Sequence, residues 1–212
     1  GFRIDRFDVL IGEVWFLSGQ SNMARDIIET DHYEEILEET KDYNPNIRFY
    51  KKYKNSTTEP DDGMGPRGGY WLTAHADDIE RAGISAVAYY YAKYLNKHLG
   101  VPVGIVLSPY AGTHIQEWID PELIRSRFDF DAKNAKIRDN RTAGGCYNAM
   151  VHPFKKFPVR GFVWYQGENN ALYNDGENYF EYLNTLIENW RQAWGDENLP
   201  FIIIQIPGYD KY

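Results

Sequence analysis

Ser21 lies where a serine hydroxyl could act as a nucleophile. It belongs to the run Gly19-Gln20-Ser21-Asn22-Met23, which follows an apolar segment at residues 9–17. A hydroxyl on a turn from strand to helix is exposed, and the helix N-terminus favours the negative charge that develops during acyl transfer. Ser21, or Ser18 before it, could equally cap the helix, a frequent role for serine. The turn alone therefore leaves a nucleophile and a helix cap as equal alternatives.

Two further polar turns follow apolar segments in the same way. Ser108-Pro109-Tyr110-Ala111-Gly112-Thr113 comes after residues 103–107, and Gln166-Gly167-Glu168-Asn169-Asn170 comes after residues 160–165. In open α/β sheets, ligands bind beyond the carboxyl ends of the strands. Ordinary connections also contain glycine and asparagine, so each turn is a weak signal by itself. Three such turns at one edge of a sheet together favour an active site.

The segments before these turns predict a parallel sheet. Four segments are apolar at successive positions rather than alternating ones, namely residues 9–17, 103–107, 160–165 and 201–206. This pattern is typical of strands that are buried on both faces.

Helical patterns lie between the predicted strands. Ser85 is placed to cap a helix that Gly100 closes, and Asn174 or Asp175 is placed to cap another that ends at Gly195. Because strands and helices alternate, we expect an α/β fold, a three-layer α/β/α sandwich with a mainly parallel sheet.

Three polar stretches are expected at the surface. Residues 29–42 are acidic and predict an exposed helix whose charges are solvated. Residues 51–70, rich in Asn, Thr, Asp, Gly and Pro, predict a long surface excursion, and the charged, irregular residues 120–146 predict another. No internal repeat or interdomain linker is evident, so residues 1–212 are expected to form a single domain.

The composition argues against several classes of protein. Of 212 residues, 43% are hydrophobic and 25% charged, as in an ordinary globular protein. The net charge of −8, without a stripe of Lys and Arg, argues against nucleic acid as a partner. No apolar run reaches the about 18 residues of a membrane span. The single cysteine, Cys146, forms no intrachain disulfide, and no Cys/His cluster has the spacing of zinc ligands.

Ser21 does not lie in the Gly-x-Ser-x-Gly elbow of the α/β-hydrolases, so another serine hydrolase architecture is needed. Residues 19–23 resemble the first block of the SGNH hydrolases, specifically of their sialate O-acetylesterase-like branch. The likeness continues, in the family's order, through residues 85–90, 101–105, 111–118, 147–153 and 164–170. The resemblance implies the flavodoxin-like SGNH architecture and a serine esterase that removes O-acetyl groups from a carbohydrate.

The resemblance also implies roles for individual residues. Ser21 would be the nucleophile, and its backbone N–H would be one oxyanion donor. The N–H of Gly112 would be a second donor and the side-chain amide of Gln166 a third, at a position where many SGNH enzymes use asparagine. Losing one such donor costs about 100- to 1,000-fold in rate. Water would hydrolyse the acetyl-serine, without a metal or an organic cofactor.

Residues around this centre are expected to bind the substrate: Gln20, Asn22, Thr113, Glu168 and Asn169. Three roles are open for Glu168, which could orient Gln20 or Asn22, bind a sugar hydroxyl, or satisfy buried backbone donors. Trp118 and Trp164 could wall an acyl pocket, although Trp164 fits core packing better.

The general base is missing from this picture. The family takes it from an Asp-x-His-Pro type block near the C-terminus of the domain, and no such block occurs before Tyr212. The histidines are His32, His75, His98, His114 and His152. For His152 a supporting hydrogen bond is a better prediction than the role of base. The chain is therefore either part of a longer enzyme or a noncatalytic relative; residues 1–8, which resemble the tail of a preceding β-rich segment, favour the first.

The resemblance implies an acetylated sugar or glycan as substrate and an extracellular or periplasmic location, and leaves the oligomeric state open. The alternative function is a carbohydrate-binding relative that keeps the cleft but has no general base. A flavodoxin-like binding domain is not favoured, because no phosphate-cradling glycine loop follows a strand.

Overall fold

The computed structural model describes residues 5, 7–42, 44–63, 68–128, 136–138, 141–173 and 176–208. Its main element is a six-stranded sheet in the order β3-β2-β4-β1-β7-β8. The strands are β1 (Glu13–Gly19), β2 (Ile47–Lys52), β3 (Gly69–Thr73), β4 (Val103–Pro109), β5 (Lys136–Arg138), β6 (Arg141–Thr142), β7 (Gly161–Tyr165) and β8 (Phe201–Ile203). Neighbours in the main sheet are parallel except β2 and β3, and β5 pairs only with β6. The predicted mainly parallel sheet is confirmed.

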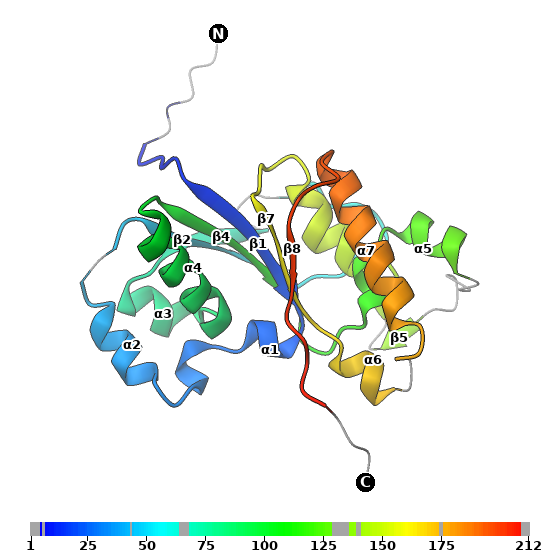
Figure 1. The fold of residues 1–212 in the computed structure, drawn as a ribbon, viewed down its shortest axis with the longest axis horizontal. Helices are drawn as coiled ribbons and strands as arrows, with labels where there is room; N and C mark the ends of the chain where they lie inside the picture. The colour runs from blue at the N-terminus through cyan, green and yellow to red at the C-terminus, as the bar shows by residue number, and fades with distance from the viewer. Residues whose placement is uncertain are drawn as a thin grey trace.

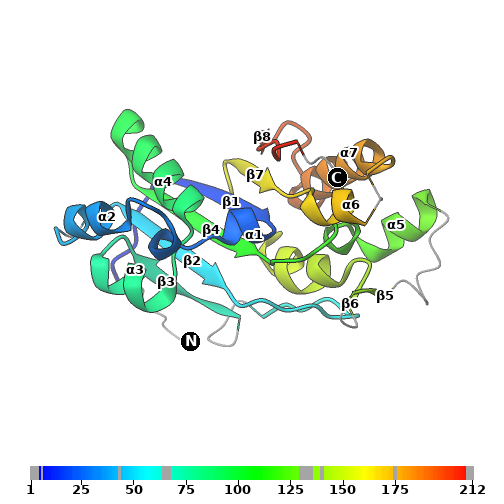
Figure 2. The same ribbon diagram turned by 90° about the horizontal axis from the view of Figure 1, so that it is seen from below.

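Helices cover both faces of this sheet (Figure 1). The α-helices are α1 (Ser21–Ala24), α2 (Tyr33–Glu39), α3 (Ala76–Ala82), α4 (Ala86–Leu99), α5 (Pro121–Arg127), α6 (Glu168–Leu172) and α7 (Tyr179–Trp194). Short 3-10 turns are η1 (Ile27–Glu29), η2 (Ile115–Trp118) and η4 (His152–Phe154), and η3 (Tyr147–Val151) is a π-helix. In two views, α2, α3 and α4 lie together on one side of the molecule and α5, α6 and α7 on the other (Figures 1 and 2).

The central strand β1 shows why the sheet is buried on both faces. Trp15 and Leu17 pack into the core cluster that contains residues of α1 to α4, whereas Phe16 packs into the cluster that contains residues of α5 and α7. Phe16 and Leu17 are fully buried. Successive apolar residues therefore serve two different cores, as the unbroken hydrophobic pattern predicts.

The predicted helix ends are confirmed where the structure describes them. Ser85 caps α4, because its Oγ accepts a hydrogen bond of 3.1 Å from a backbone N–H of the first turn. Gly100 ends this helix in the left-handed conformation, at φ 66°, and Gly195 ends α7 in the same way. The predicted caps Asn174 and Asp175 lie outside the described residues.

Two predicted strands are shorter in the structure than in the sequence pattern. The apolar run was expected to be extended from residue 9, yet β1 begins at Glu13, opposite Val103, the first residue of its neighbour β4. Before that point no strand is available for pairing, and Val9 and Ile11 are 69% and 92% exposed. At one side edge of the sheet, β8 pairs with β7 alone among the described strands, and it ends at Ile203 rather than at residue 206.

The three polar stretches have different outcomes. The acidic stretch does contain a mostly exposed helix, α2. The excursion expected at residues 51–70 begins and ends in strands, since β2 reaches Lys52 and β3 starts at Gly69. The sequence pattern did not predict these strands, because β2 and β3 are less uniformly apolar than the central strands. Residues 120–146 contain α5, β5 and β6 and contribute a buried side chain to the interior, Arg141.

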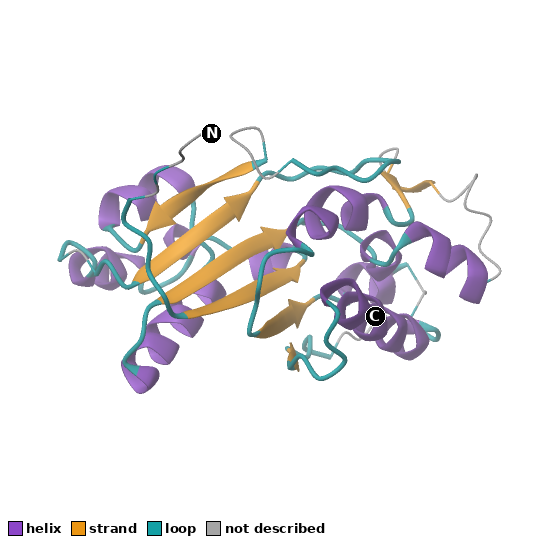
Figure 3. Ribbon diagram, turned by 90° about the horizontal axis from the view of Figure 1, so that it is seen from above, coloured by secondary structure: helices purple, strands orange, loops and turns teal. Residues whose placement is uncertain are grey.

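The carboxyl ends of the parallel strands meet at one edge of the sheet (Figure 3). This edge holds the start of α1 after β1 and the start of α6 after β7. Within the described residues no helix has the length and apolar character needed to cross a membrane.

Candidate active site

The three polar turns predicted from the sequence are brought together at this edge. Gly19 at the end of β1 stands opposite Pro109 of β4 on one side and Tyr165 of β7 on the other. Backbone bonds join the turns, with Gln20 N–H donating to the carbonyl of Tyr165 at 3.0 Å and Tyr110 N–H to the carbonyl of Gly19 at 3.0 Å. The central position of β1 therefore places the Ser21 turn between the other two.

Gly19 is required for this close approach. It has φ 142°, and a Cβ built on it would lie 2.0 Å from the carbonyl oxygen of Tyr165. Any side chain there would push the end of β1 away from β7. The glycine thus allows the chain to turn sharply into α1 directly beside its neighbouring strand.

Ser21 is the first residue of α1, and neither it nor Ser18 caps this helix. The N-cap position belongs to Gln20, which makes no side-chain capping bond. Ser18 is buried, and its Oγ donates to the carbonyl of Ser108 at 2.8 Å, which ties β1 to β4. Ser21 is exposed, and its hydroxyl makes no hydrogen bond with any described residue. The helix-cap alternative is therefore wrong, and the hydroxyl is accessible for chemistry.

Gln166 joins all three turns through a buried network. Its Nε2 lies 3.0 Å from Oε1 of Gln20, 2.9 Å from the carbonyl oxygen of Thr113 and 2.9 Å from Oδ1 of Asn170. Its Oε1 accepts a hydrogen bond of 2.9 Å from the hydroxyl of Tyr179. An amide has two N–H hydrogens, so acceptors of the protein already engage both. The oxyanion-donor role expected for Gln166 would require this side chain to leave the network.

Two of the expected substrate-binding side chains are also committed to the protein. Gln20 is 2% exposed, and its Oε1 accepts from both Gln166 and the backbone N–H of Asn169. Thr113 is fully buried, and its Oγ1 donates to the carbonyl of Tyr110 at 2.8 Å and accepts from Nε1 of Trp118 at 3.0 Å. This burial leaves Thr113 no side-chain surface for a ligand.

The three other expected residues are Asn22, Glu168 and Asn169, and two of them keep a polar atom without a partner among the described residues. Asn22 donates its Nδ2 to Oε1 of Glu168 at 2.5 Å, so one of the three roles considered for Glu168, orienting Asn22, is present. Its second oxygen, Oε2, is buried without a partner among the described residues, and so is Nδ2 of Asn169. A Cβ built on Gly112 would lie 3.9 Å from that Nδ2. An unpartnered donor and an unpartnered acceptor therefore lie beside the serine turn.

Gly112 presents a further donor. It adopts the left-handed conformation, at φ 72°, in the turn between β4 and η2, and its N–H donates to no other group of the described residues. Its carbonyl oxygen accepts a hydrogen bond of 2.5 Å from Nη2 of Arg141. The carbonyl of Gly112 is thus held by Arg141, while its N–H is available to a ligand.

Arg141 and Glu117 form a buried ion pair next to this turn, which the sequence did not predict. Nε of Arg141 lies 2.9 Å from Oε2 of Glu117, close enough for an ion pair but not aligned as a hydrogen bond. Burial lowers the pKa of Arg141, but the charge of Glu117 and other contacts outweigh it and raise the pKa overall. Arg141 therefore stays charged. The burial of Arg141 could have been predicted only from its pairing with Glu117. The two residues are 24 positions apart, and sequence spacing does not show that they meet.

Cys146 touches the same ion pair but is a poor nucleophile. Its Sγ lies 3.7 Å from Oε2 of Glu117, and the residue is fully buried. Burial first, and then the negative charge of Glu117, raises the pKa of the thiol well above its ordinary value. The thiolate that would attack an ester is therefore disfavoured.

Among the described residues, which include every histidine of the chain, no histidine forms a hydrogen bond with Ser21. His152 pairs with Asp62, at 3.4 Å from Nε2 to Oδ1, and its Nδ1 lies 3.4 Å from Nζ of Lys155. His114 is buried, and its ring lies tilted against that of Tyr173 with centroids 5.5 Å apart. The remaining histidines bond to residues near them in sequence, namely His32, His75 and His98.

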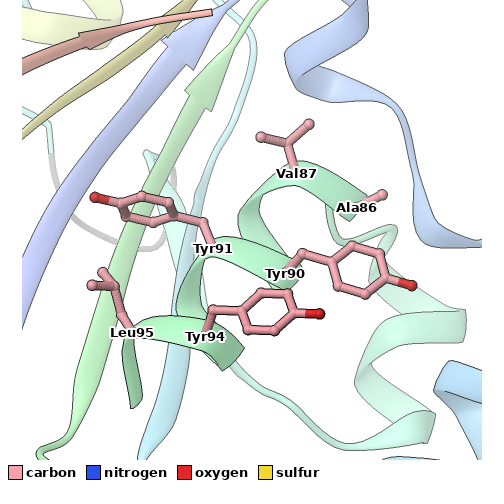
Figure 4. A pocket seen from close by; sticks show the side chains of 6 residues that line it. All are labelled: Ala86, Val87, Tyr90, Tyr91, Tyr94 and Leu95. Carbon is pink, nitrogen blue, oxygen red and sulfur yellow. The ribbon is translucent and has the colours of Figure 1, made fainter. Parts of the chain in front are cut away.

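An apolar hollow lies elsewhere, against α4 (Figure 4). It is lined by Ala86, Val87, Tyr90, Tyr91, Tyr94 and Leu95. The rings of Tyr90 and Tyr94 stack, with centroids 6.4 Å apart. No residue of the three turns lines this hollow, so it is separate from the serine site.

Both tryptophans considered as pocket walls belong to the core. Trp118 and Trp164 are fully buried, and their rings meet edge to face with centroids 5.8 Å apart. Core packing, the preferred interpretation for Trp164, is therefore what the structure shows for both.

Comparisons with known proteins identify the family of the chain. Residues 11–211 match the family described as carbohydrate esterase, sialic acid-specific acetylesterase. The chain is 28% identical over 245 residues to rat (Rattus norvegicus) sialate O-acetylesterase, covering 95% of this chain and 44% of that protein.

Solved structures give the same picture. A carbohydrate acetylesterase from Xanthomonas citri superposes with a TM-score of 0.76 at 32% identity, over 91% of this chain and 40% of that one. A protein from Arabidopsis thaliana shares the fold, with a TM-score of 0.51 at 23% identity, over 92% of this chain and 74% of that one. The chain spans less than half the length of the rat and Xanthomonas relatives.

Proposed function

The chain belongs to the sialic acid-specific acetylesterase family of carbohydrate esterases, and on this basis we propose that it removes O-acetyl groups from a carbohydrate through an acetyl-serine intermediate. The observation that carries the proposal is the convergence of an unbonded Ser21 hydroxyl with unpartnered hydrogen-bond donors at the carboxyl edge of the sheet. Serine acyl transfer needs this combination of nucleophile and oxyanion donors.

In the proposed reaction Ser21 Oγ attacks the carbonyl carbon of the acetyl ester. The carbonyl oxygen becomes an oxyanion, for which the N–H groups of Ser21 and Gly112 are two donors. We assign the third to Nδ2 of Asn169, because this buried donor has no partner while the amide of Gln166 is engaged. The bond between the acetyl carbon and the sugar oxygen then breaks, and this oxygen takes up the proton that Ser21 loses, so that the sugar leaves as an alcohol. Water then hydrolyses the acetyl-serine to acetic acid and free Ser21.

The substrate class follows from the relatives and from Glu168. The rat relative is a sialate O-acetylesterase and the Xanthomonas relative a carbohydrate acetylesterase. The unpartnered Oε2 of Glu168 could accept a hydrogen bond from a sugar hydroxyl near the ester. We therefore propose an acetylated sugar or glycan, with 9-O-acetylated sialic acid as the first compound to test, encountered outside the cytoplasm.

The test compares the wild-type protein with Ser21→Ala on p-nitrophenyl acetate and on acetylated sugars. Ser126→Ala is the matched control, because Ser126 is an exposed serine of α5 whose Oγ donates to a neighbouring carbonyl. We expect Ser21→Ala to lose hydrolysis and labelling by a fluorophosphonate, and Ser126→Ala to keep both. Equal rates for wild type and Ser21→Ala, with retained binding to acetylated sugars, would instead establish the noncatalytic carbohydrate-binding alternative.

A further inference from the structure

Three carbonyl groups of the turn that carries Gly112 accept hydrogen bonds from side chains. The carbonyl of Tyr110 accepts from Thr113 Oγ1 at 2.8 Å, that of Gly112 from Arg141 Nη2 at 2.5 Å, and that of Thr113 from Gln166 Nε2 at 2.9 Å. Three successive attachments of this kind fix the orientation of the peptide groups between them. Of the three side chains, only that of Arg141 comes from the charged, irregular stretch after α5.

Arg141 is fixed by contacts on several sides. Its side chain is 9% exposed, its Nε lies 2.9 Å from Oε2 of Glu117, and its guanidinium carbon lies 4.9 Å from the centre of the Tyr110 ring. Oε1 of Glu117, in turn, accepts a hydrogen bond of 2.9 Å from the backbone N–H of His114. The pair therefore holds the turn at two points, the carbonyl of Gly112 and the N–H of His114.

This arrangement suits the planar guanidinium, which presents several N–H groups in a rigid fork. One edge meets Glu117 while Nη2 reaches Gly112. A lysine ammonium is a compact charge on a flexible stem and does not reproduce both contacts with one fixed orientation. The chemistry of the site therefore calls for arginine at this position.

We propose that Arg141, held by Glu117, is a positioning residue that aims the N–H of Gly112 at the oxyanion. The inference rests on the proposed function, since it assigns a role within that reaction. Gly112 sits at φ 72°, and its N–H belongs to the peptide group between Ala111 and Gly112, which lies between the anchored carbonyls of Tyr110 and Gly112. Arg141 does not act through its charge, because the adjacent carboxylate of Glu117 is fully buried and compensates it.

The first experiment measures kcat and KM of Arg141→Lys on p-nitrophenyl acetate. The matched control is Arg127→Lys, because Arg127 makes an exposed ion pair with Glu188 at 2.5 Å on α7. We expect kcat of Arg141→Lys to fall about 10- to 100-fold with KM within about twofold, since displacing a catalytic group by about 1 Å costs about 100-fold. Arg127→Lys is expected to match wild type.

Glu117→Gln separates positioning from charge and serves if Arg141→Lys does not fold. It keeps the shape of the side chain but leaves Arg141 without its counter-charge. Positioning predicts a lower kcat, whereas a direct effect of the arginine charge on the oxyanion predicts a higher one. Methylguanidinium at millimolar concentration is expected to restore part of the kcat of Arg141→Ala and to leave Arg127→Ala unchanged.

The outcomes are distinguishable from failure of the proposed function. If wild type and Ser21→Ala hydrolyse the ester equally, the esterase itself is refuted and the role of Arg141 with it. A different outcome overturns the positioning role alone. In it, wild type is active, and Arg141→Lys and Glu117→Gln both fold and have the same kcat as Arg127→Lys. A rise in KM without a change in kcat would also overturn it.

Discussion

Replacing Asn169 by alanine should separate the proposed oxyanion donor from the network that surrounds it. Nδ2 of Asn169 is buried and bonds to no described residue, so in the resting protein it contributes little to folding. In the proposed transition state the same group donates to the oxyanion. We therefore expect Asn169→Ala to lower kcat strongly while leaving KM and stability almost unchanged.

The magnitudes follow from the contacts. Loss of one oxyanion donor costs about 100- to 1,000-fold in kcat, which corresponds to about 2.7–4 kcal/mol. An unsatisfied buried donor costs about 1–3 kcal/mol, so removing it offsets the small cavity that alanine leaves. Gln166→Ala, by contrast, removes the bonds to Gln20, Thr113 and Asn170, each contributing about 1 kcal/mol. Asn169→Ala should thus lose catalytic rate, whereas Gln166→Ala should lose stability.

The assay pairs hydrolysis of p-nitrophenyl acetate with thermal unfolding of both variants. For Asn169→Ala we expect a Tm within about 4 °C of wild type, because a change of 1 kcal/mol shifts Tm by about 2–4 °C in a chain of this size. For Gln166→Ala we expect a clear loss of Tm. If Asn169→Ala keeps kcat within about threefold of wild type, the assignment of this donor is refuted and Gln166 becomes the donor to test.

Two further predictions concern folding. Gly19→Ala should destabilise the protein by more than about 3 kcal/mol in urea unfolding, because its Cβ would lie 2.0 Å from the carbonyl oxygen of Tyr165; an unchanged midpoint would contradict the required approach. Burial raises the pKa of Tyr179 to about 12, so the folded protein holds this phenol proton more tightly than the unfolded chain. Stability from Tyr179 is therefore complete below pH about 10 and is lost as the pH rises towards 12, so Tyr179→Phe should lose less stability over this range than wild type or the exposed control Tyr94→Phe. Equal losses of stability between pH about 10 and 12 in wild type, Tyr179→Phe and Tyr94→Phe would refute this role of Tyr179.

Local signals in the sequence predicted the parts of the fold that depend on short stretches. The Ser85 cap, the glycine at position 100 and the unbroken apolar run of β1 each act through neighbours within a few residues. The rule that ligands collect at the carboxyl ends of strands then located the site. These features need no knowledge of long-range contacts.

Contacts between distant residues could not be predicted in the same way. Arg141 lies in a stretch whose charges predict a solvated surface, yet it is buried beside Glu117, the carbonyl of Gly112 and the ring of Tyr110. Gln166 has the amide expected of an oxyanion donor, yet acceptors from the two other turns, Gln20 and Thr113, use it. The start of β1 at Glu13 likewise depends on where β4 begins. In each case a partner far along the chain decides the outcome.

The position of β1 at the centre of the sheet also has a consequence for how the protein folds. Glu13 pairs with Val103 and Trp15 with Gly161, so the strand beneath the serine turn joins partners 90 and 146 positions away. Such high contact order slows folding, because long loops must close before these pairings form. The geometry of the proposed active site is therefore expected to be absent from early folding intermediates. A substitution in β4 or β7 that only delays sheet assembly would lower the yield of active protein without changing the turnover of the molecules that fold.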